Sequence, residues 1–307
     1  MHEGAEDYRR YLDPGALASV ASLDLRARLL AQGFMTGLHR SPLHGFSVEF
    51  AEHRKYCQGD DLRFIDWKVY GRTDKHYIKE YEQETNLRLL ILVDCSDSMN
   101  YRSAGAPMSK RDYAITIAAV IAYLALHQSD AVGVATFDTR LRRAHRTTNQ
   151  PGQWKVIIRE LEHAEHVGRT SLRSVLDELS ESLTERHLVV ILGDLFSPLE
   201  DILLGIKHVR HRRHEPLVQQ TLDPAELTFP FDGPTEFVGL EEAGIQRTDP
   251  HFARQQYLDE LKRFTDSIRR GCLEQRVDYQ LLDTAAPVGP ALSRYLATRA
   301  ARTRSRN

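Results

Sequence analysis

The sequence of 307 residues has few cysteines and almost no net charge. Its three cysteines, Cys57, Cys95 and Cys272, lie far apart and form no Cys-x-x-Cys pair. This usage favours a reducing compartment over a secreted disulfide framework. A formal net charge of −2 provides no basic field that would attract nucleic acid or an anionic membrane. We therefore expect no nucleic-acid partner.

Long hydrophobic segments are also missing. The longest, YAITIAAVIAYLAL from Tyr113 to Leu126, is shorter than the roughly 20 residues that span a bilayer, and it is typical of a core helix. The first residues, MHEGAEDYRR, lack the apolar region of a signal peptide. We expect a cytoplasmic protein with no membrane span. No Gly-x-x-x-x-Gly-Lys-[Ser/Thr] motif is present, so no P-loop for ATP is expected.

Short apolar strands alternate with helices from Leu87 onward. The expected strands cover residues 87–94, 131–138, 187–196, 216–223 and 277–283. The expected helices cover residues 109–128, 153–164, 171–183, 201–213, 252–275 and 291–300. This order predicts the α/β class, with a doubly wound, mostly parallel sheet that has helices on both faces.

The changes in sequence pattern divide the chain into three parts. Residues 1–86 form an N-terminal segment, with a helix over 14–37 and a strand within HYIKEYEQE. Residues 87–290 form the α/β domain, which has a surface insertion at about 224–250. Residues 291–307 form a C-terminal helix and a basic tail.

Oxygen-bearing side chains follow the first predicted strand of the α/β domain. The strand LRLLILVD ends in Asp94, and Ser96 and Ser98 follow at alternate positions, so that the three side chains can face one point. In such sheets, ligands bind at the carboxyl ends of the strands, near the point where the strand order reverses. Thr170, after a glycine turn, and Asp194, at a later strand end, are expected at the same edge. Carboxylates and hydroxyls suit Mg²⁺ or Mn²⁺.

The order Asp94-x-Ser96-x-Ser98, then Thr170, then Asp194 resembles the metal-ion-dependent adhesion site (MIDAS) of von Willebrand factor A (vWA) domains. The upstream block EFAEHRKYCQGDDLRFIDWKVYGRTDKHYIKEYEQE is similar to the signature of the bacterial DUF58 family, in which such a block precedes an A-type domain. The resemblance is strong over about residues 38–200 and rests on organisation alone beyond them. It implies a Rossmann-like vWA fold.

The resemblance also implies a function and a set of roles. In that family the serines and the threonine hold one Mg²⁺, and the aspartates contact it directly or through water. A carboxylate from an Asp or Glu of a partner protein completes the site, which makes the domain a non-enzymatic protein-binding module. DUF58 proteins resemble companions of MoxR-type AAA+ ATPases, in assembly or maturation of other proteins. Arg169 stands where the family has small residues, and could either weaken cation binding or clamp the partner's acidic group.

Each of these residues also has a structural interpretation. Ser, Thr and Asp commonly cap helices and fill turns, but five of them in this order at strand ends favour a metal site. We interpret the block GDDLRFIDW at 59–67 as packing of the N-terminal segment rather than as a docking surface. Cys95 has no adjacent His or Lys that would activate a thiolate, so we expect it to point into the core.

Two other functions remain as alternatives. A Mg²⁺-dependent phosphohydrolase of the haloacid dehalogenase type also places an aspartate at the end of its first strand. Such an enzyme needs a second carboxylate two residues later as general acid and base, but Ser96 occupies that position here. Lys110 is available to balance the charge of a phosphate. The last alternative is a structural A-type domain without a bound metal.

Overall fold

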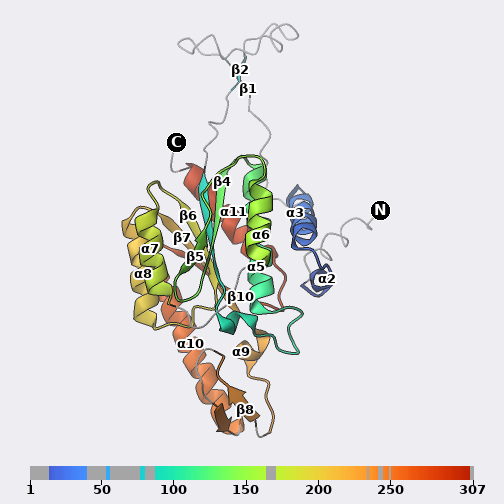
Figure 1. Ribbon diagram of the computed structural model, residues 1–307, viewed down its shortest axis with the longest axis vertical. Coiled ribbons are helices and arrows are strands. Elements are labelled where there is room, and N and C mark those ends of the chain that lie inside the picture. The colour runs from blue at the N-terminus through green and yellow to red at the C-terminus, as the bar shows by residue number, and fades with distance from the viewer. Residues whose placement is uncertain are drawn as a thin grey trace.

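The computed structural model describes residues 14–39, 53–55, 77–79, 87–163, 171–233, 235–240, 245–248 and 250–304. A six-stranded sheet lies at its centre (Figure 1). In sheet order its strands are β10 (Asp278–Asp283), β7 (Glu215–Leu222), β6 (Leu188–Gly193), β3 (Arg88–Asp94), β4 (Ala131–Phe137) and β5 (Leu141–Ala144). Every neighbouring pair is parallel except β4 and β5. The predicted α/β class with a mostly parallel, doubly wound sheet is confirmed.

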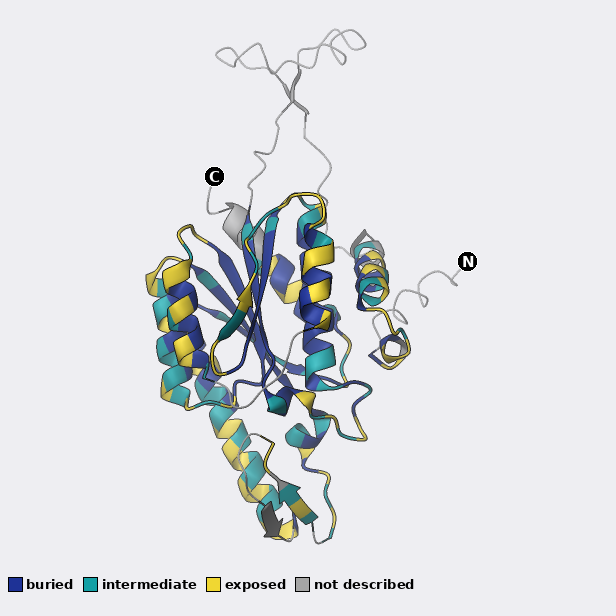
Figure 2. Ribbon diagram, in the orientation of Figure 1, coloured by how far each residue is buried: buried dark blue, intermediate teal, exposed yellow. Residues whose placement is uncertain are grey.

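Helices cover both faces of the sheet (Figure 1). One layer consists of α5 (Lys110–His127), α6 (Gln153–Glu162) and α11 (Gly289–Arg304), and the other of α7 (Leu172–Ser182), α8 (Leu199–His211) and α10 (Pro250–Glu274). Successive side chains of a strand point to opposite faces, so a strand covered on both sides is apolar at every position. In β3, Leu89 and Ile91 pack in the α5 layer, whereas Leu90 and Leu92 pack with α7 and α8. Figure 2 shows the same pattern, with buried strands between helices whose outer faces are exposed.

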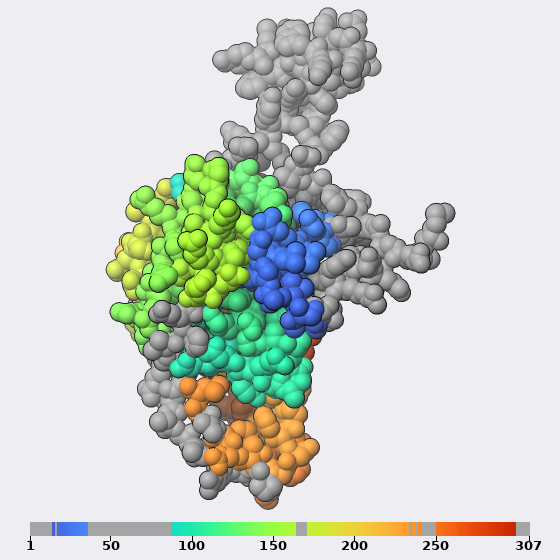
Figure 3. Space-filling view, turned by 45° about the vertical axis from the view of Figure 1, so that its right-hand side comes forward, coloured from blue at the N-terminus to red at the C-terminus, as the bar shows by residue number. Residues whose placement is uncertain are grey.

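The helix predicted over 14–37 is two helices, α2 (Pro14–Ala18) and α3 (Leu23–His39). The break follows from Ser22, whose hydroxyl accepts a hydrogen bond from Leu25 N at 3.3 Å, as a helix-capping serine does. Buried residues of α3, such as Leu30 and Phe34, share one hydrophobic cluster with α5. Figure 3 shows α2 and α3 lying on the outside of the α/β layers.

Two parts of the fold carry no periodic signal in the sequence. The antiparallel edge strand β5 reads LRRA, which lacks the apolar alternation of a half-buried strand. The region expected as a surface insertion contains α9 (Pro224–Thr228) and a hairpin of β8 (Thr235–Val238) and β9 (Ile245–Thr248), followed by α10. Figure 1 shows the hairpin beside the start of α10, beyond the carboxyl edge of the sheet.

Little of the upstream family-like block lies within the described residues. The described part consists of β1 (His53–Lys55) and β2 (Tyr77–Lys79), which pair antiparallel. The strand predicted within HYIKEYEQE is therefore present as β2. The block GDDLRFIDW lies outside the described residues, and its two interpretations stay predictions. Among the helices of the described ranges, none combines the length and apolar character needed to cross a bilayer.

Candidate metal centre

The strand order reverses between β3 and β6. From β3 the chain continues to β4 on one side, and it later crosses to β6 on the other side. The carboxyl ends of β3 and β6 therefore flank the switch point, where ligands bind in open α/β sheets. Asp94 is the last residue of β3, and Asp194 directly follows β6. Both of these predicted site residues are fully buried at this edge.

The loop after β3 is held by hydrogen bonds that turn both serines toward the switch point. Cys95 N donates to Phe137 O at 2.8 Å, which extends the ladder with β4 by one residue. Ser96 N donates to Asp94 Oδ1 at 2.9 Å. A short 3₁₀ helix, η2 (Asp97–Asn100), follows and carries Ser98. The strand-end aspartate thus fixes the loop through its own carboxylate, as Asp commonly does in tight turns.

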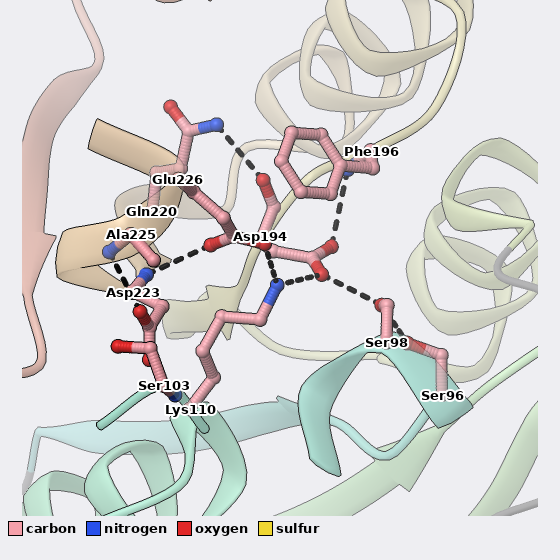
Figure 4. Close-up of polar contacts among 10 residues, drawn as sticks. All are labelled: Ser96, Ser98, Ser103, Lys110, Asp194, Phe196, Gln220, Asp223, Ala225 and Glu226. Atoms are coloured by element: carbon pink, nitrogen blue, oxygen red, sulfur yellow. Dashed lines mark hydrogen bonds and ion pairs between the residues drawn. The ribbon is translucent and has the colours of Figure 1, made fainter. Parts of the chain in front are cut away.

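Three of the predicted oxygen ligands form a hydrogen-bonded chain (Figure 4). Ser96 Oγ lies 3.1 Å from Ser98 Oγ, and Ser98 Oγ donates to Asp194 Oδ2 at 2.6 Å. A hydroxyl has one proton, so Ser98 donates to Asp194 and accepts from Ser96. The structure therefore brings together the side chains of Ser96, Ser98 and Asp194, as predicted from strand-end position.

Asp94 lies directly against the end of the neighbouring strand. A Cβ placed on Gly193 would lie 2.9 Å from Asp94 Oδ2 and 2.7 Å from Asp94 Cβ. Separations below 3.0 Å are not tolerated by a real Cβ. Only glycine at the last position of β6 leaves room for the Asp94 carboxylate between the two strand ends.

Asp194 is fixed from several sides. Its Oδ1 accepts a hydrogen bond from Phe196 N at 3.1 Å, and its backbone carbonyl accepts one from Gln220 Nε2 at 2.8 Å. Gln220 Oε1 in turn accepts from the Tyr279 hydroxyl at 2.6 Å. Leu195 turns the chain with a left-handed φ of 59°, which is rare for a residue with a branched side chain. The orientation of the Asp194 carboxylate is therefore set by the surrounding structure.

A lysine that the sequence interpretation did not assign to the metal site also contacts Asp194. Lys110 Nζ lies 2.9 Å from Asp194 Oδ2 and 2.7 Å from Glu226 Oε1 (Figure 4). The ammonium also lies 5.0 Å from the centre of the Phe196 ring, within cation–π range. Burial favours the neutral amine, but the two carboxylates outweigh it and raise the pKa of Lys110. Lys110 is therefore a buried ammonium.

Glu226 holds its position through the cap of α9. Its Oε2 accepts a hydrogen bond from Asp223 N at 2.8 Å, while Asp223 Oδ1 accepts from Ala225 N at 2.8 Å. The Asp223 side chain also accepts from the backbone N–H of Glu226, and together with the Asp223 N to Glu226 bond this forms a capping box. Asp223 Oδ2 also accepts from Ser103 N at 2.9 Å, which links α9 to the loop before α5. The sequence DPAE carries the capping signal, but nothing in it indicates that Glu226 reaches Lys110.

The remaining predicted residues have different outcomes. Thr170 and Arg169 lie outside the described residues, so their roles stay predictions. Ser171, which follows them, donates its backbone N–H to Asp138 O at 3.1 Å, at the carboxyl end of β4. Cys95 is fully buried in the hydrophobic core, and burial raises the pKa of its thiol to about 12. The expected inward orientation of Cys95 is confirmed.

The donor chemistry at the switch point fits a hard divalent cation. Two carboxylates and two hydroxyls provide only oxygen ligands, which Mg²⁺ and Mn²⁺ prefer over nitrogen and sulfur. Within the described ranges, no three His, Cys, Asp or Glu side chains gather as a metal-binding group, and the oxygen set here consists of two carboxylates and two serine hydroxyls. Asp194 is already paired with one cation, the Lys110 ammonium, so a divalent ion at this carboxylate would compete with it.

These features define a doubly wound α/β domain with an oxygen-rich site at its switch point. The family described as "Protein of unknown function DUF58" matches residues 52–265. The chain therefore belongs to the DUF58 family. It is 27% identical over 224 residues to "Uncharacterized protein Rv1480" of Mycobacterium tuberculosis and to "Uncharacterized protein Mb1516" of Mycobacterium bovis. The matches cover 72% of this chain and 69% of each relative.

Two solved structures are similar at low sequence identity. The conserved hypothetical protein BatB from Bacteroides thetaiotaomicron has a TM-score of 0.49 and 14% identity, and the match covers 70% of this chain and 98% of BatB. An aerotolerance-related membrane protein from Bacteroides fragilis has a TM-score of 0.45 and 15% identity, with 67% and 96% covered. At these values neither likeness carries an argument about function.

Proposed function

We propose that this DUF58 protein is a non-enzymatic, metal-dependent protein-binding module with a vWA-type adhesion site. The observation that carries the proposal is the 2.6 Å contact between Ser98 Oγ and Asp194 Oδ2, which are 96 residues apart in the chain. Together with Asp94 and Ser96, it gathers hydroxyl and carboxylate oxygens at the switch point of the sheet. These are four of the five ligands expected from the motif and the distant aspartate, and Thr170, the fifth, remains a prediction.

Each residue has a distinct part in the proposed site. Ser96, Ser98 and Thr170 bind Mg²⁺, or Mn²⁺, through their hydroxyls, while Asp94 and Asp194 contact the ion directly or orient its waters. When bound, the ion offers an open coordination position to a carboxylate of a partner protein. Asp94 also holds the serine loop in place, because its Oδ1 accepts the Ser96 N–H.

We further propose that the partner is a protein that supplies an Asp or Glu, and that it is a MoxR-type AAA+ ATPase or a client of one. The family resemblance supports this part of the proposal, which includes a cytoplasmic location and a role in assembly or maturation of other proteins. Arg169, next to Thr170, is the candidate for a contact with the partner's acidic group.

Calorimetric titration of the full chain with Mg²⁺ and with Mn²⁺ tests the metal site. The wild type should bind one ion saturably, and Ser96→Ala should lose most of that binding. Ser180→Ala is the matched control, because Ser180 is another buried serine whose hydroxyl bonds to Leu176 O on α7. Equal binding by wild type and Ser96→Ala would reduce the motif to turn and cap residues.

The partner is tested with a purified MoxR-type ATPase from the same organism. Co-elution in Mg²⁺ that is lost in EDTA, and lost with Ser96→Ala but kept with Ser180→Ala, would support the proposed interaction. Binding that is unchanged by EDTA would contradict a carboxylate-to-metal contact.

One observation favours the phosphohydrolase as a second candidate. Lys110 lies at the site, 2.9 Å from Asp194, where a lysine could balance the charge of a phosphate. However, Ser96 at two residues after Asp94 cannot act as a general acid or base near neutral pH. Hydrolysis of p-nitrophenyl phosphate in Mg²⁺ by the wild type, abolished in Asp94→Asn, would replace the binding module with this enzyme.

A further inference from the structure

In this structure, Asp194 is paired with a cation of the protein itself, the Lys110 ammonium. The side chains of Lys110 and Asp194 are fully buried, and that of Glu226 is 15% exposed. A buried ammonium needs a compensating negative charge, which Asp194 and Glu226 provide here. Lys110 is the first residue of α5, where the helix dipole disfavours a positive charge, so its position follows from the two carboxylates and not from the helix.

The contacts of Asp194 leave little room for an additional cation. Its Oδ2 accepts from both Ser98 Oγ at 2.6 Å and Lys110 Nζ at 2.9 Å, and its Oδ1 accepts from Phe196 N. A divalent ion at Ser96 and Ser98 would meet the Lys110 ammonium at the same oxygen, and two cations at one carboxylate repel each other. One of the existing donors must therefore leave Asp194 for such an ion to bind this carboxylate directly.

Glu226 can hold the Lys110 ammonium after the ammonium has left Asp194. Its Oε1 already accepts from Lys110 Nζ at 2.7 Å, and its other oxygen is held by Asp223 N in the cap of α9. The Lys110 ammonium can therefore give up Asp194 and remain charge-paired within its existing contacts. Ser98, in contrast, is one of the proposed metal ligands.

We propose that Lys110 is the resident counter-cation of this site, which moves from Asp194 to Glu226 alone when Mg²⁺ or Mn²⁺ binds. This inference rests on the proposed metal site and adds a mechanism that sets its affinity for the ion. Lys110 sets how strongly a divalent ion must compete for Asp194, and Glu226 weakens that competition because it retains the displaced ammonium.

The two residues have opposite predicted effects on Mg²⁺ affinity. Lys110→Met removes the competing cation and should tighten Mg²⁺ binding by about tenfold or more, a change typical of one buried charge contact. Glu226→Gln leaves Lys110 dependent on Asp194 and should weaken binding by about tenfold. Glu160→Gln, which alters another buried carboxylate that pairs with His145 on the α6 side, should leave the affinity unchanged.

The double variant separates this exchange from simple electrostatics. If Glu226 acts only through Lys110, then Glu226→Gln should have little effect on Mg²⁺ affinity in the Lys110→Met background. If it acts only as a nearby negative charge, the two effects should add. Calorimetric Kd values for the wild type, both single variants and the double variant provide the cycle, and thermal unfolding in EDTA reports whether each variant folds.

The outcomes distinguish the inference from the proposed function. Wild-type Mg²⁺ binding together with additive effects, or with weaker binding in Lys110→Met, would overturn the counter-cation and keep the metal site. No Mg²⁺ binding in any variant would overturn both. If Lys110→Met fails to fold, Lys110→Gln replaces it, since an amide removes the charge and can still donate a hydrogen bond.

Discussion

The last residue of β6, Gly193, touches the carboxylate at the end of β3, Asp94. A Cβ on Gly193 would lie 2.7 Å from Asp94 Cβ and 2.9 Å from Asp94 Oδ2. The two strands that flank the switch point are thus adapted to each other at the position where the candidate metal site begins. One strand ends in an aspartate, and its neighbour ends in a glycine, which leaves space for that aspartate.

Gly193→Ala should therefore displace Asp94 and weaken Mg²⁺ binding. The added methyl group has no room between the strand ends, and such overpacking costs about 1–3 kcal/mol of unfolding free energy. Gly133→Ala on β4 is the matched control, because its Cβ would lie 2.6 Å from the backbone oxygen of His145, away from the switch point. Denaturant unfolding should show strain in both variants, whereas calorimetry should show lost Mg²⁺ affinity only in Gly193→Ala. Full Mg²⁺ affinity in Gly193→Ala would show that the Asp94 position is not critical.

Asp94→Asn separates the charge of Asp94 from its structural role. The amide oxygen can still accept the Ser96 N–H that now bonds to Asp94 Oδ1 at 2.9 Å, so the loop should keep its conformation. Circular dichroism in EDTA should stay close to wild type for Asp94→Asn, and also for Asp94→Ala and Ser96→Ala, since the fold does not depend on the metal. The melting temperature should stay close to wild type for Asp94→Asn and Ser96→Ala, whereas Asp94→Ala should melt lower because the Ser96 N–H loses its acceptor. Mg²⁺ affinity and partner binding should fall in all three. Unfolding of these variants without metal would assign the motif to stability.

The stability of the α9 insertion should depend on a cluster of aromatic rings. Phe229 is buried, with ring centres 5.1 Å from Phe231, 5.6 Å from Phe237 and 4.8 Å from Tyr257. Phe229→Ala should destabilise the hairpin by about 3 kcal/mol, the usual scale for a buried Phe truncation. Hydrogen exchange and limited proteolysis would detect this as local opening of α9 and of strands β8 and β9. Phe252→Ala, at a side chain that is 84% exposed, should change neither measurement.

The architecture was predictable because the strands are buried on both faces. LRLLILVD and HLVVILGD contain the unbroken apolar runs LLILV and LVVIL, which a sheet covered by two helical layers requires, and both end in an aspartate. The positions of Asp94 and Asp194 at one edge follow from parallel topology alone. In contrast, β5 is a polar edge strand and α9 is only five residues long, so neither has a periodic pattern to detect.

The Lys110–Glu226 contact was not predictable for a different reason. The two residues are 116 positions apart, and a charged residue at the start of a helix or in a helix cap is normally solvated. Lys110 is buried because η2, β6 and α9 meet around it, which is a property of tertiary packing. Only the three-dimensional structure shows that the lysine considered for phosphate binding lies on the candidate metal carboxylate.

Stability at acid pH should depend on Asp138, the residue that follows β4. Its carboxylate is buried and pairs with Arg142 Nη2 at 2.6 Å. Burial acts to raise the pKa of Asp138, but hydrogen bonds from Arg142 and Arg140 N outweigh it and lower the pKa below its usual value. A carboxyl whose pKa is lowered by folding stabilises the protein above its unfolded pKa of about 3.9 and loses that contribution as the pH falls through the folded pKa. Asp138→Asn should therefore be less stable than wild type at pH 7, and the difference should shrink below about pH 4. Urea unfolding of both proteins from pH 7 to pH 3 measures this, and a stability difference independent of pH would show that the pair contributes through packing instead of charge.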